Sequence, residues 1–277
     1  MYKATFVNGN WVLPNEIYFD RQVVVYFNFF LSHLHTIDSS NFNVLGVFAE
    51  PEYFRDSNGQ VVAHKSKFNL ILANDPVILR SCSNATFMPF GGNWVLNEDA
   101  SQMLPDQKKF KISFICGSKT YTEGHHLRHR IWARQKEITT PREFWISKNA
   151  PVAPVDNNPM FPERFKKDAL FRDSQFHVCV ENVKQPGYFS EKICDAFVTR
   201  TIPIYWGCPD IGKYFDPKGI ITFSSDNDLI RICNGLSADD YAKKIVHVEN
   251  NYRAIQGMSY NALGTRIHDK IQEFLVK

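Results

Sequence analysis

An acid and an amide stand together at the end of an apolar run, and an acid–lysine pair follows a short distance along the chain. The run ends on Glu181 and Asn182, while Glu191 and Lys192 come directly after Ser190, a residue type that favours helix N-caps. In open α/β sheets, ligands gather beyond the carboxyl ends of the strands, beside helix N-termini whose free amides favour anions. We therefore expect these side chains to face one crevice.

Lys192 is the residue of this group that a purely structural role explains least well. A cation in the first turn of a helix is unfavourable by about 0.3 to 1 kcal/mol, because it faces the positive end of the helix dipole. A bound diphosphate would offset this cost. Glu191 is a good partner for the same end of the helix, so a simple helix start remains open for Glu191.

The composition favours an ordinary globular protein. The 277 residues include 32 Lys and Arg against 29 Asp and Glu, without a basic block, so nucleic acid is not an expected partner. We expect no signal peptide and no integral membrane segment, since the chain has no leader-like start and no window of about 18 apolar residues. The 6 cysteines form no CxxC pair, and buried free thiols in a cytoplasmic protein are the expectation.

Strand-like apolar runs alternate with helical patterns from Asn43 to Phe223, which predicts α/β layers with parallel strands. In the second half, "FKISFIC", "FHVCV" and "TIPIYWG" are predicted strands, and "SEKICDAFVTR" is a predicted helix capped by Ser190. The segment 141–165 holds 5 prolines and is expected to be an irregular connection.

We place a domain boundary in the polar segment 97–109, near residue 105. The predicted domains are an N-terminal acceptor-side domain, residues 1–105, and a C-terminal nucleotide-sugar-binding domain, residues 106–277. The final helical stretch, "RIHDKIQEFLVK", carries its apolar residues on one stripe, which favours a packed helix. This helix can cross back to the first domain.

The stretch from Phe176 to Gly207 resembles the nucleotide-binding motif of the α1,3-fucosyltransferases, glycosyltransferase family 10. Bacterial members read approximately F-x-L-x-F-E-N-(T/S)-x4-Y-x-T-E-K-I, followed by I-P-I-Y-W-G. This chain matches the motif at Phe176, Glu181, Asn182, Tyr188, Ser190, Glu191, Lys192, Ile193 and Ile202 to Gly207. It departs from the motif at Val180 and Val183, and Ser190 stands where the motif has threonine. The resemblance extends over roughly Phe110 to Phe223.

The resemblance implies a GT-B fold, an α/β architecture of two Rossmann-like domains facing each other across a cleft. It also implies that Glu191 holds the nucleotide ribose and Lys192 neutralises the diphosphate, with Asn182 and Tyr188 completing the donor pocket. These groups suit a diol and a pyrophosphate chemically. A turn role for Asn182 and a packing role for Tyr188 stay open.

Family members carry a second cation in the helix after the first strand of this domain. Arg128 is the best match in "CGSKTYTEGHHLRHRIW", and a guanidinium there would contact phosphate oxygens. Arg130 and Arg134 are the competing candidates and are more typical of a solvated helix face.

Transfer to a hydroxyl group needs a general base. The resemblance places this base at the end of a strand in the N-terminal domain, where we choose Glu50 and keep Glu52 as the alternative. The DxD pattern of Asp226 and Asp228 is interpreted as a helix start after Ser225, so no metal and no other cofactor is expected.

The sequence therefore predicts an inverting, metal-independent glycosyltransferase that moves fucose from GDP-fucose to a hydroxyl of a glycan acceptor. The expected partners are a nucleotide sugar and a glycan. Two alternatives stay open: the same scaffold with another nucleotide sugar, and a non-catalytic module that binds a sugar or a nucleotide.

Overall fold

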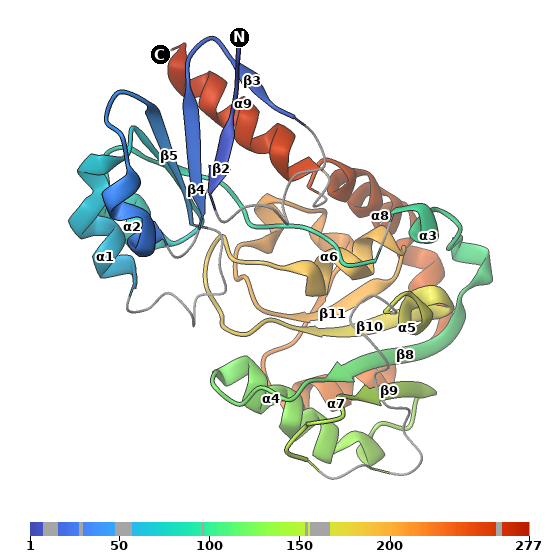
Figure 1. Ribbon diagram of the computed structural model, residues 1–277. Helices are drawn as coiled ribbons and strands as arrows, with labels where there is room; N and C mark the ends of the chain where they lie inside the picture. Colours follow the sequence, from blue (N-terminus) through green and yellow to red (C-terminus); the bar gives the residue numbers. More distant parts are fainter. Residues whose placement is uncertain are drawn as a thin grey trace. The chain divides into compact units, whose positions relative to one another are not determined.

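The computed structural model describes residues 1–7, 16–27, 30–47, 57–95, 97–152, 155, 167–258 and 262–276. The chain divides into two compact units, residues 1–90 with 258–277 (unit 1) and residues 91–257 (unit 2) (Figure 1). Residues 91–105 thus belong to the second unit. The predicted domain boundary near residue 105 stays a prediction. Among the described residues, no helix has both the length and the apolar character needed to cross a membrane.

Unit 1 contains a parallel five-stranded sheet whose described strands follow one another across the sheet in chain order. The strands are β2 (Thr5–Val7), β4 (Val23–Phe27), β5 (Phe42–Val47), β6 (Leu70–Ala73) and β7 (Ala85–Phe87). Right-handed crossovers between sequential neighbours place the connecting segments on one face of the sheet. On one face, α1 (Ser57–His64) and α2 (Pro76–Ser81) contribute Val61 and Ile78 to an apolar cluster.

The last helix of the chain, α9 (Leu263–Leu275), covers the other face of this sheet. Its buried residues Leu263, Ile267 and Ile271 pack in one cluster with Val23 and other side chains of the strands. Figure 1 shows α9 beside the strands of unit 1. Because the crossovers leave this face open, the sheet depends on a helix supplied from the far end of the chain.

We expect Ile267→Ala to lower the free energy of unfolding by about 2 to 5 kcal/mol, because it removes buried methyl groups and leaves a cavity in this cluster. Chemical denaturation of the purified protein measures the change. The matched control is Val276→Ala, since Val276 is 85% exposed and should change stability by less than about 0.5 kcal/mol. Equal effects of the two substitutions would contradict the packing of α9 on the sheet.

Unit 2 contains a second parallel sheet, with the strand order β12-β11-β10-β8-β9. The strands are β8 (Lys109–Cys116), β9 (Arg142–Ile146), β10 (Ser174–Val180), β11 (Ile202–Trp206) and β12 (Ile221–Thr222). The helices of this unit are α3 (Asn97–Ser101), α4 (Glu123–Ala133), α5 (Asp168–Arg172), α6 (Glu191–Val198), α7 (Asp226–Gly235) and α8 (Ala238–Gln256). The strand order reverses between β8 and β10, which is where open α/β sheets bind ligands.

The three strands and the capped helix that the sequence predicts in the second half are confirmed as β8, β10, β11 and α6. The prediction of an irregular connection over 141–165 is wrong for residues 142–146, which form β9. This strand pairs with β8, and Phe144 packs edge-to-face on Phe114 with ring centroids 5.2 Å apart. Pro141 directly precedes the strand and Pro151 follows it, so neither interrupts the strand.

Candidate functional site

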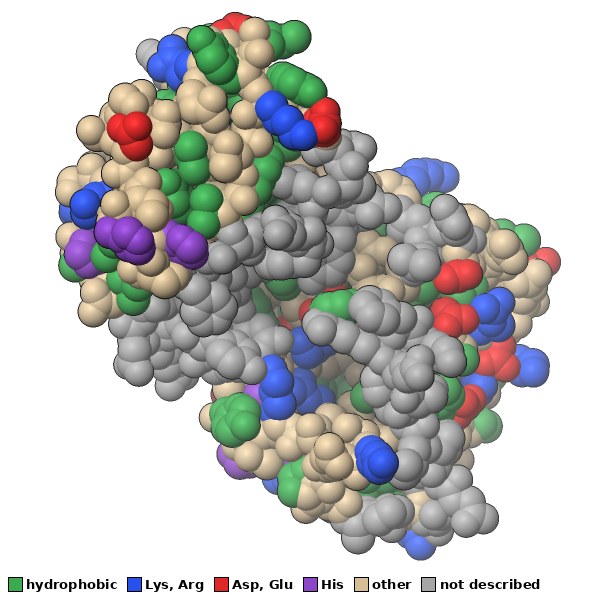
Figure 2. Space-filling view, viewed as in Figure 1, with side chains coloured by type: hydrophobic (Ala, Val, Ile, Leu, Met, Phe, Trp, Pro, Cys, Tyr) green, Lys and Arg blue, Asp and Glu red, His purple; other side chains and the backbone are tan. Residues whose placement is uncertain are grey.

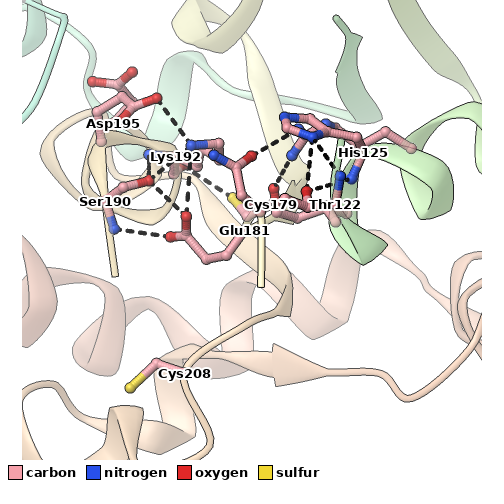
Figure 3. Close-up of polar contacts among 12 residues, drawn as sticks. Thr122, His125, Cys179, Glu181, Ser190, Lys192, Asp195 and Cys208 are labelled. Atoms are coloured by element: carbon pink, nitrogen blue, oxygen red, sulfur yellow. Dashed lines mark hydrogen bonds and ion pairs between the residues drawn. The ribbon is translucent and has the colours of Figure 1, made fainter. Parts of the chain in front are cut away.

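The carboxyl end of β10 is joined to the N-terminus of α6 by a buried carboxylate. Glu181 directly follows β10 and is 0% exposed. It accepts hydrogen bonds from the backbone nitrogen of Ser190 at 2.9 Å and from the Ser190 hydroxyl at 2.6 Å. Ser190 is the N-cap of α6, and its Oγ accepts a hydrogen bond from the backbone nitrogen of Lys192. Figure 3 shows Glu181, Ser190 and Lys192 connected in this way.

The ammonium group of Lys192 lies among these oxygens. Its Nζ donates to Ser190 Oγ at 3.0 Å and to Glu191 Oε1 at 3.2 Å, and it lies 3.6 Å from Glu181 Oε2. The structure therefore offers protein carboxylates that compensate a cation at this helix end. A diphosphate is not required to explain Lys192, so its contact with a diphosphate stays a prediction.

The two glutamates of the site ionise differently. Burial raises the pKa of Glu181, although Lys192 and the hydrogen bonds from Ser190 oppose the rise. Burial also disfavours the charged form of Glu191, but Lys192 and then Lys167 outweigh it and lower the pKa of Glu191 to about 2. Glu191 is therefore a carboxylate at neutral pH and can only accept hydrogen bonds.

The side chain of Arg128 connects α4 to the end of β10 through hydrogen bonds. Its side chain is buried, and Nη1 donates to the carbonyl of Val180 at 2.5 Å while Nη2 donates to Asn182 Oδ1 at 2.9 Å. Burial lowers the pKa of Arg128, and the negative charge of Glu181 is the largest opposing effect. Both hydrogen bonds hold the protein's own strand end, so contact of Arg128 with a diphosphate also stays a prediction.

Gly124 allows α4 to approach this strand end closely. Its backbone nitrogen donates to the carbonyl of Asn182 at 2.9 Å, and a Cβ atom at this position would lie 1.8 Å from the carbonyl oxygen of Glu181. Gly207, after β11, is similarly close, because a Cβ there would lie 2.5 Å from Glu181 Cγ. The close approach at both glycines was not predicted from the sequence, although Gly207 is part of the matched motif. A glycine inside the first helical turn of "TEGHH" was the available signal.

We expect Gly124→Ala to destabilise the protein by about 1 to 3 kcal/mol or more, because the added methyl group collides with backbone atoms that cannot move aside. The thermal unfolding midpoint measures the effect. The control is Gly235→Ala at the end of α7, where nothing lies within 4 Å of the added Cβ. An unchanged midpoint for Gly124→Ala would contradict the close approach of α4 to β10.

The remaining candidate residues divide into described and undescribed positions. Asn182 is 2% exposed and Tyr188 is 0% exposed, so both are part of the packed interior beside the site. Tyr188 follows Gly187, whose φ of 73° favours glycine. Glu50 and Glu52 lie outside the described residues, so the base remains a prediction.

The competing arginines are engaged at the start of α7. Arg134 Nη1 donates to Asp226 Oδ2 at 3.0 Å, and Arg130 Nε lies 3.8 Å from the same oxygen. The backbone N–H of Asp228 donates a hydrogen bond to Ser225 Oγ, as expected of a helix N-terminus.

In the part of the chain that the structure describes, no group of three His, Cys, Asp or Glu residues could hold a metal ion. Figure 2 shows Lys and Arg side chains gathered on unit 2 over the region where Figure 1 places α4.

Asp195, a buried acid on α6, was missed by the sequence analysis. It is 1% exposed, and its Oδ1 accepts hydrogen bonds from the backbone nitrogens of Trp94 at 2.6 Å and Val95 at 3.0 Å. Burial raises the pKa of Asp195 to about 6, against the opposing charge of Lys167. The signal was an acid inside the apolar run "ICDAF", four residues after Glu191.

Comparison with known proteins finds no matching family model but does find sequence relatives. The chain is 33% identical over 97 residues, 34% of its length, to an α-(1,3)-fucosyltransferase, FucT, of Helicobacter pylori. It is 30% identical over 86 residues, 30% of its length, to a putative fucosyltransferase of Acanthamoeba polyphaga mimivirus. The matches span 20% and 14% of the two relatives, respectively.

Solved structures with the same fold cover most of the chain. An α1,3-fucosyltransferase in complex with GDP-fucose aligns with a TM-score of 0.52 and 16% identity, over 87% of this chain and 77% of that one. HepE of Anabaena in complex with UDP-glucose aligns with a TM-score of 0.63 and 12% identity, over 91% of this chain and 78% of that one. The predicted fold class is confirmed: the chain has the GT-B fold with two Rossmann-like α/β units.

Proposed function

We propose that this chain, which is similar over about a third of its length to fucosyltransferases, is an enzyme that transfers fucose from GDP-fucose to a hydroxyl group of a glycan acceptor. One observation supports a donor site in unit 2. Arg128 and Lys192 reach two consecutive residues, Asn182 and Glu181, at the carboxyl end of β10. Two cations from successive crossover helices thus meet at the reversal of the strand order.

The proposed donor contacts follow from the chemistry of each side chain. The Glu191 carboxylate, held ionised by neighbouring lysines, accepts hydrogen bonds from the ribose diol. Lys192, at the N-terminus of α6, and Arg128 stabilise the diphosphate, together with the free amides of the helix. Asn182 and Tyr188 complete the pocket.

The proposed reaction inverts the configuration of the anomeric carbon. Glu50 removes the proton of the acceptor hydroxyl, the oxygen attacks the carbon from the side opposite to the nucleotide, and the C–O bond to GDP breaks. The electron pair leaves with the diphosphate, whose developing charge Lys192 and Arg128 stabilise. These side chains carry the step without a metal ion in this proposal.

The donor is tested by binding and turnover with a panel of nucleotide sugars. We expect GDP-fucose to bind and to release GDP when glycan acceptors are present. If the protein turns over UDP-sugars and GDP-fucose stays inert, the donor is a UDP-sugar and the proposal of GDP-fucose is wrong. Binding without turnover on any acceptor would favour a non-catalytic module.

We expect Lys192→Met to weaken GDP-fucose binding by about 10- to 100-fold, because it removes a charged partner of the diphosphate. Isothermal titration calorimetry measures the dissociation constant. The control is Lys109→Met at the opposite end of the sheet, where the side chain is 75% exposed. If both variants bind GDP-fucose as the unchanged protein does, Lys192 is not a donor contact.

We expect Glu50→Gln to lower kcat by about 100- to 10,000-fold, because the acceptor proton loses its general base. The affinity for GDP-fucose should not change, since the proposed donor contacts lie in unit 2. Glu52→Gln is the matched comparison and should keep most of the activity. If Glu52→Gln loses activity and Glu50→Gln keeps it, Glu52 is the base. Full activity of both variants would show that neither glutamate is the base.

A further inference from the structure

Asp195 has one carboxylate oxygen that no hydrogen bond from the described residues satisfies. Its Oδ1 is held by the backbone amides of Trp94 and Val95, but Oδ2 is buried and accepts no hydrogen bond from them or from other described groups. The nearest charge to Oδ2 is the ammonium of Lys167, with Nζ at 3.8 Å. A buried oxygen with a single, rather distant ionic partner depends strongly on that partner.

The charge of Lys167 affects two carboxylates of α6. Glu191 and Asp195 are four residues apart and therefore share one face of the helix. Lys167 acts on both, since its charge stabilises the ionised form of each. Its Nζ also lies 5.9 Å from the ring centroid of Trp94. Glu191 is thus stabilised as a carboxylate by both Lys192 and Lys167.

The charges of this cluster balance among the described residues. The cations are Arg128, Lys167 and Lys192, and the carboxylates are Glu181, Glu191 and Asp195. A sugar nucleotide adds about two negative charges at neutral pH. A lysine that turns to the diphosphate leaves a carboxylate without the cation that compensated its charge. A buried carboxylate without a nearby cation has a raised pKa and takes up a proton.

Asp195 is the carboxylate best placed to do so. Both oxygens of Glu181 accept hydrogen bonds from Ser190, and Glu191 Oε1 accepts one from Lys192 Nζ, whereas Asp195 Oδ2 accepts none from the described residues. We propose that Lys167 is a further donor-site cation and that Asp195 is its positioning partner: when a nucleotide diphosphate sugar binds, Lys167 turns from Asp195 to the diphosphate, and Oδ2 of Asp195 takes up a proton from solvent. This inference rests on the proposed function.

The groups around Asp195 make this proton available near neutral pH. Lys167, which precedes α5, and Glu191 on α6 are the charged groups that act on it among the described residues, and the backbone amides of Trp94 and Val95 donate hydrogen bonds to it from the segment before α3. The buried thiols of Cys179 and Cys194 are the other titratable groups that interact with it. Burial already raises the pKa of Asp195 to about 6. A nearby diphosphate raises the pKa further.

Titration calorimetry with GDP-fucose tests the proposal. GDP-fucose is chosen because its diphosphate is esterified at both ends and keeps a constant charge between about pH 5.5 and 8. At pH 6.5, titrations in buffers of different ionisation enthalpy should show uptake of about half a proton for a rise of about one unit in the pKa of Asp195. Because the bound form holds more protons, affinity should fall as the pH rises from 6 to 8, by about 5-fold for that rise in the pKa.

Two variants separate the proposal from a structural role of Asp195. Asp195→Asn keeps the shape and the acceptor for the two amides, and we expect it to abolish proton uptake and flatten the pH dependence. Lys167→Met should weaken GDP-fucose binding by about 10-fold and also abolish uptake, because no ammonium group then leaves Asp195 when the diphosphate binds. Asp173→Asn is the control: Asp173 pairs with lysines at the amino end of β10 and should leave uptake unchanged.

Binding of GDP-fucose without proton uptake would overturn the inference, as would uptake that persists in both Asp195→Asn and Lys167→Met. The same holds if Lys167→Met binds GDP-fucose as tightly as the unchanged protein. If GDP-fucose does not bind to the unchanged protein at all, the proposed function fails first, so the two failures are distinguishable.

Discussion

The buried carboxylate of Glu181 determines how the rest of the site is arranged. A fully buried acid is costly unless hydrogen bonds and a cation compensate it. Here the compensation comes from Ser190, which caps α6, and from Lys192 in the first turn of that helix. The helix start is thereby attached to the end of β10, and Glu191 is brought beside the same strand end. Substitutions at Glu181 would disturb all of these contacts together.

The topology of unit 2 supplies the second half of this arrangement. Because the strand order reverses between β8 and β10, the helix after β8 begins near the end of β10. Gly124 lets the two backbones touch, and Arg128 then spans Val180 and Asn182. The cations at 128 and 192 therefore contact neighbouring residues at the end of β10, Asn182 and Glu181.

The charge balance of the site has a functional meaning as well as a structural one. Each cation near α6 has a carboxylate partner among the described residues, so the cluster is stable as it stands but has little spare positive charge for an anion. In the coupling proposed above, a diphosphate competes with these carboxylates for the lysines. Asp195, whose Oδ2 accepts no hydrogen bond from the described residues, is then the group at which proton binding and donor binding are linked.

The sequence by itself determined the local parts of this protein. Spacing and residue type predicted β8, β10, β11 and α6 with its cap at Ser190, and the motif predicted the family resemblance that the sequence relatives confirm. These features depend on neighbours along the chain, where the periods of strands and helices are visible. The GT-B fold followed from the resemblance and is confirmed.

Only the tertiary structure decided which distant residues meet. Gly124 meets Glu181, Arg128 meets Asn182, and Lys167 meets Asp195, and no local period connects these positions. β9 was missed for the same reason, since its pairing with β8 outweighs the prolines around it. Packing between elements brings these groups into contact and removes them from water, and burial is what gives Asp195 its raised pKa and Lys167 its partner.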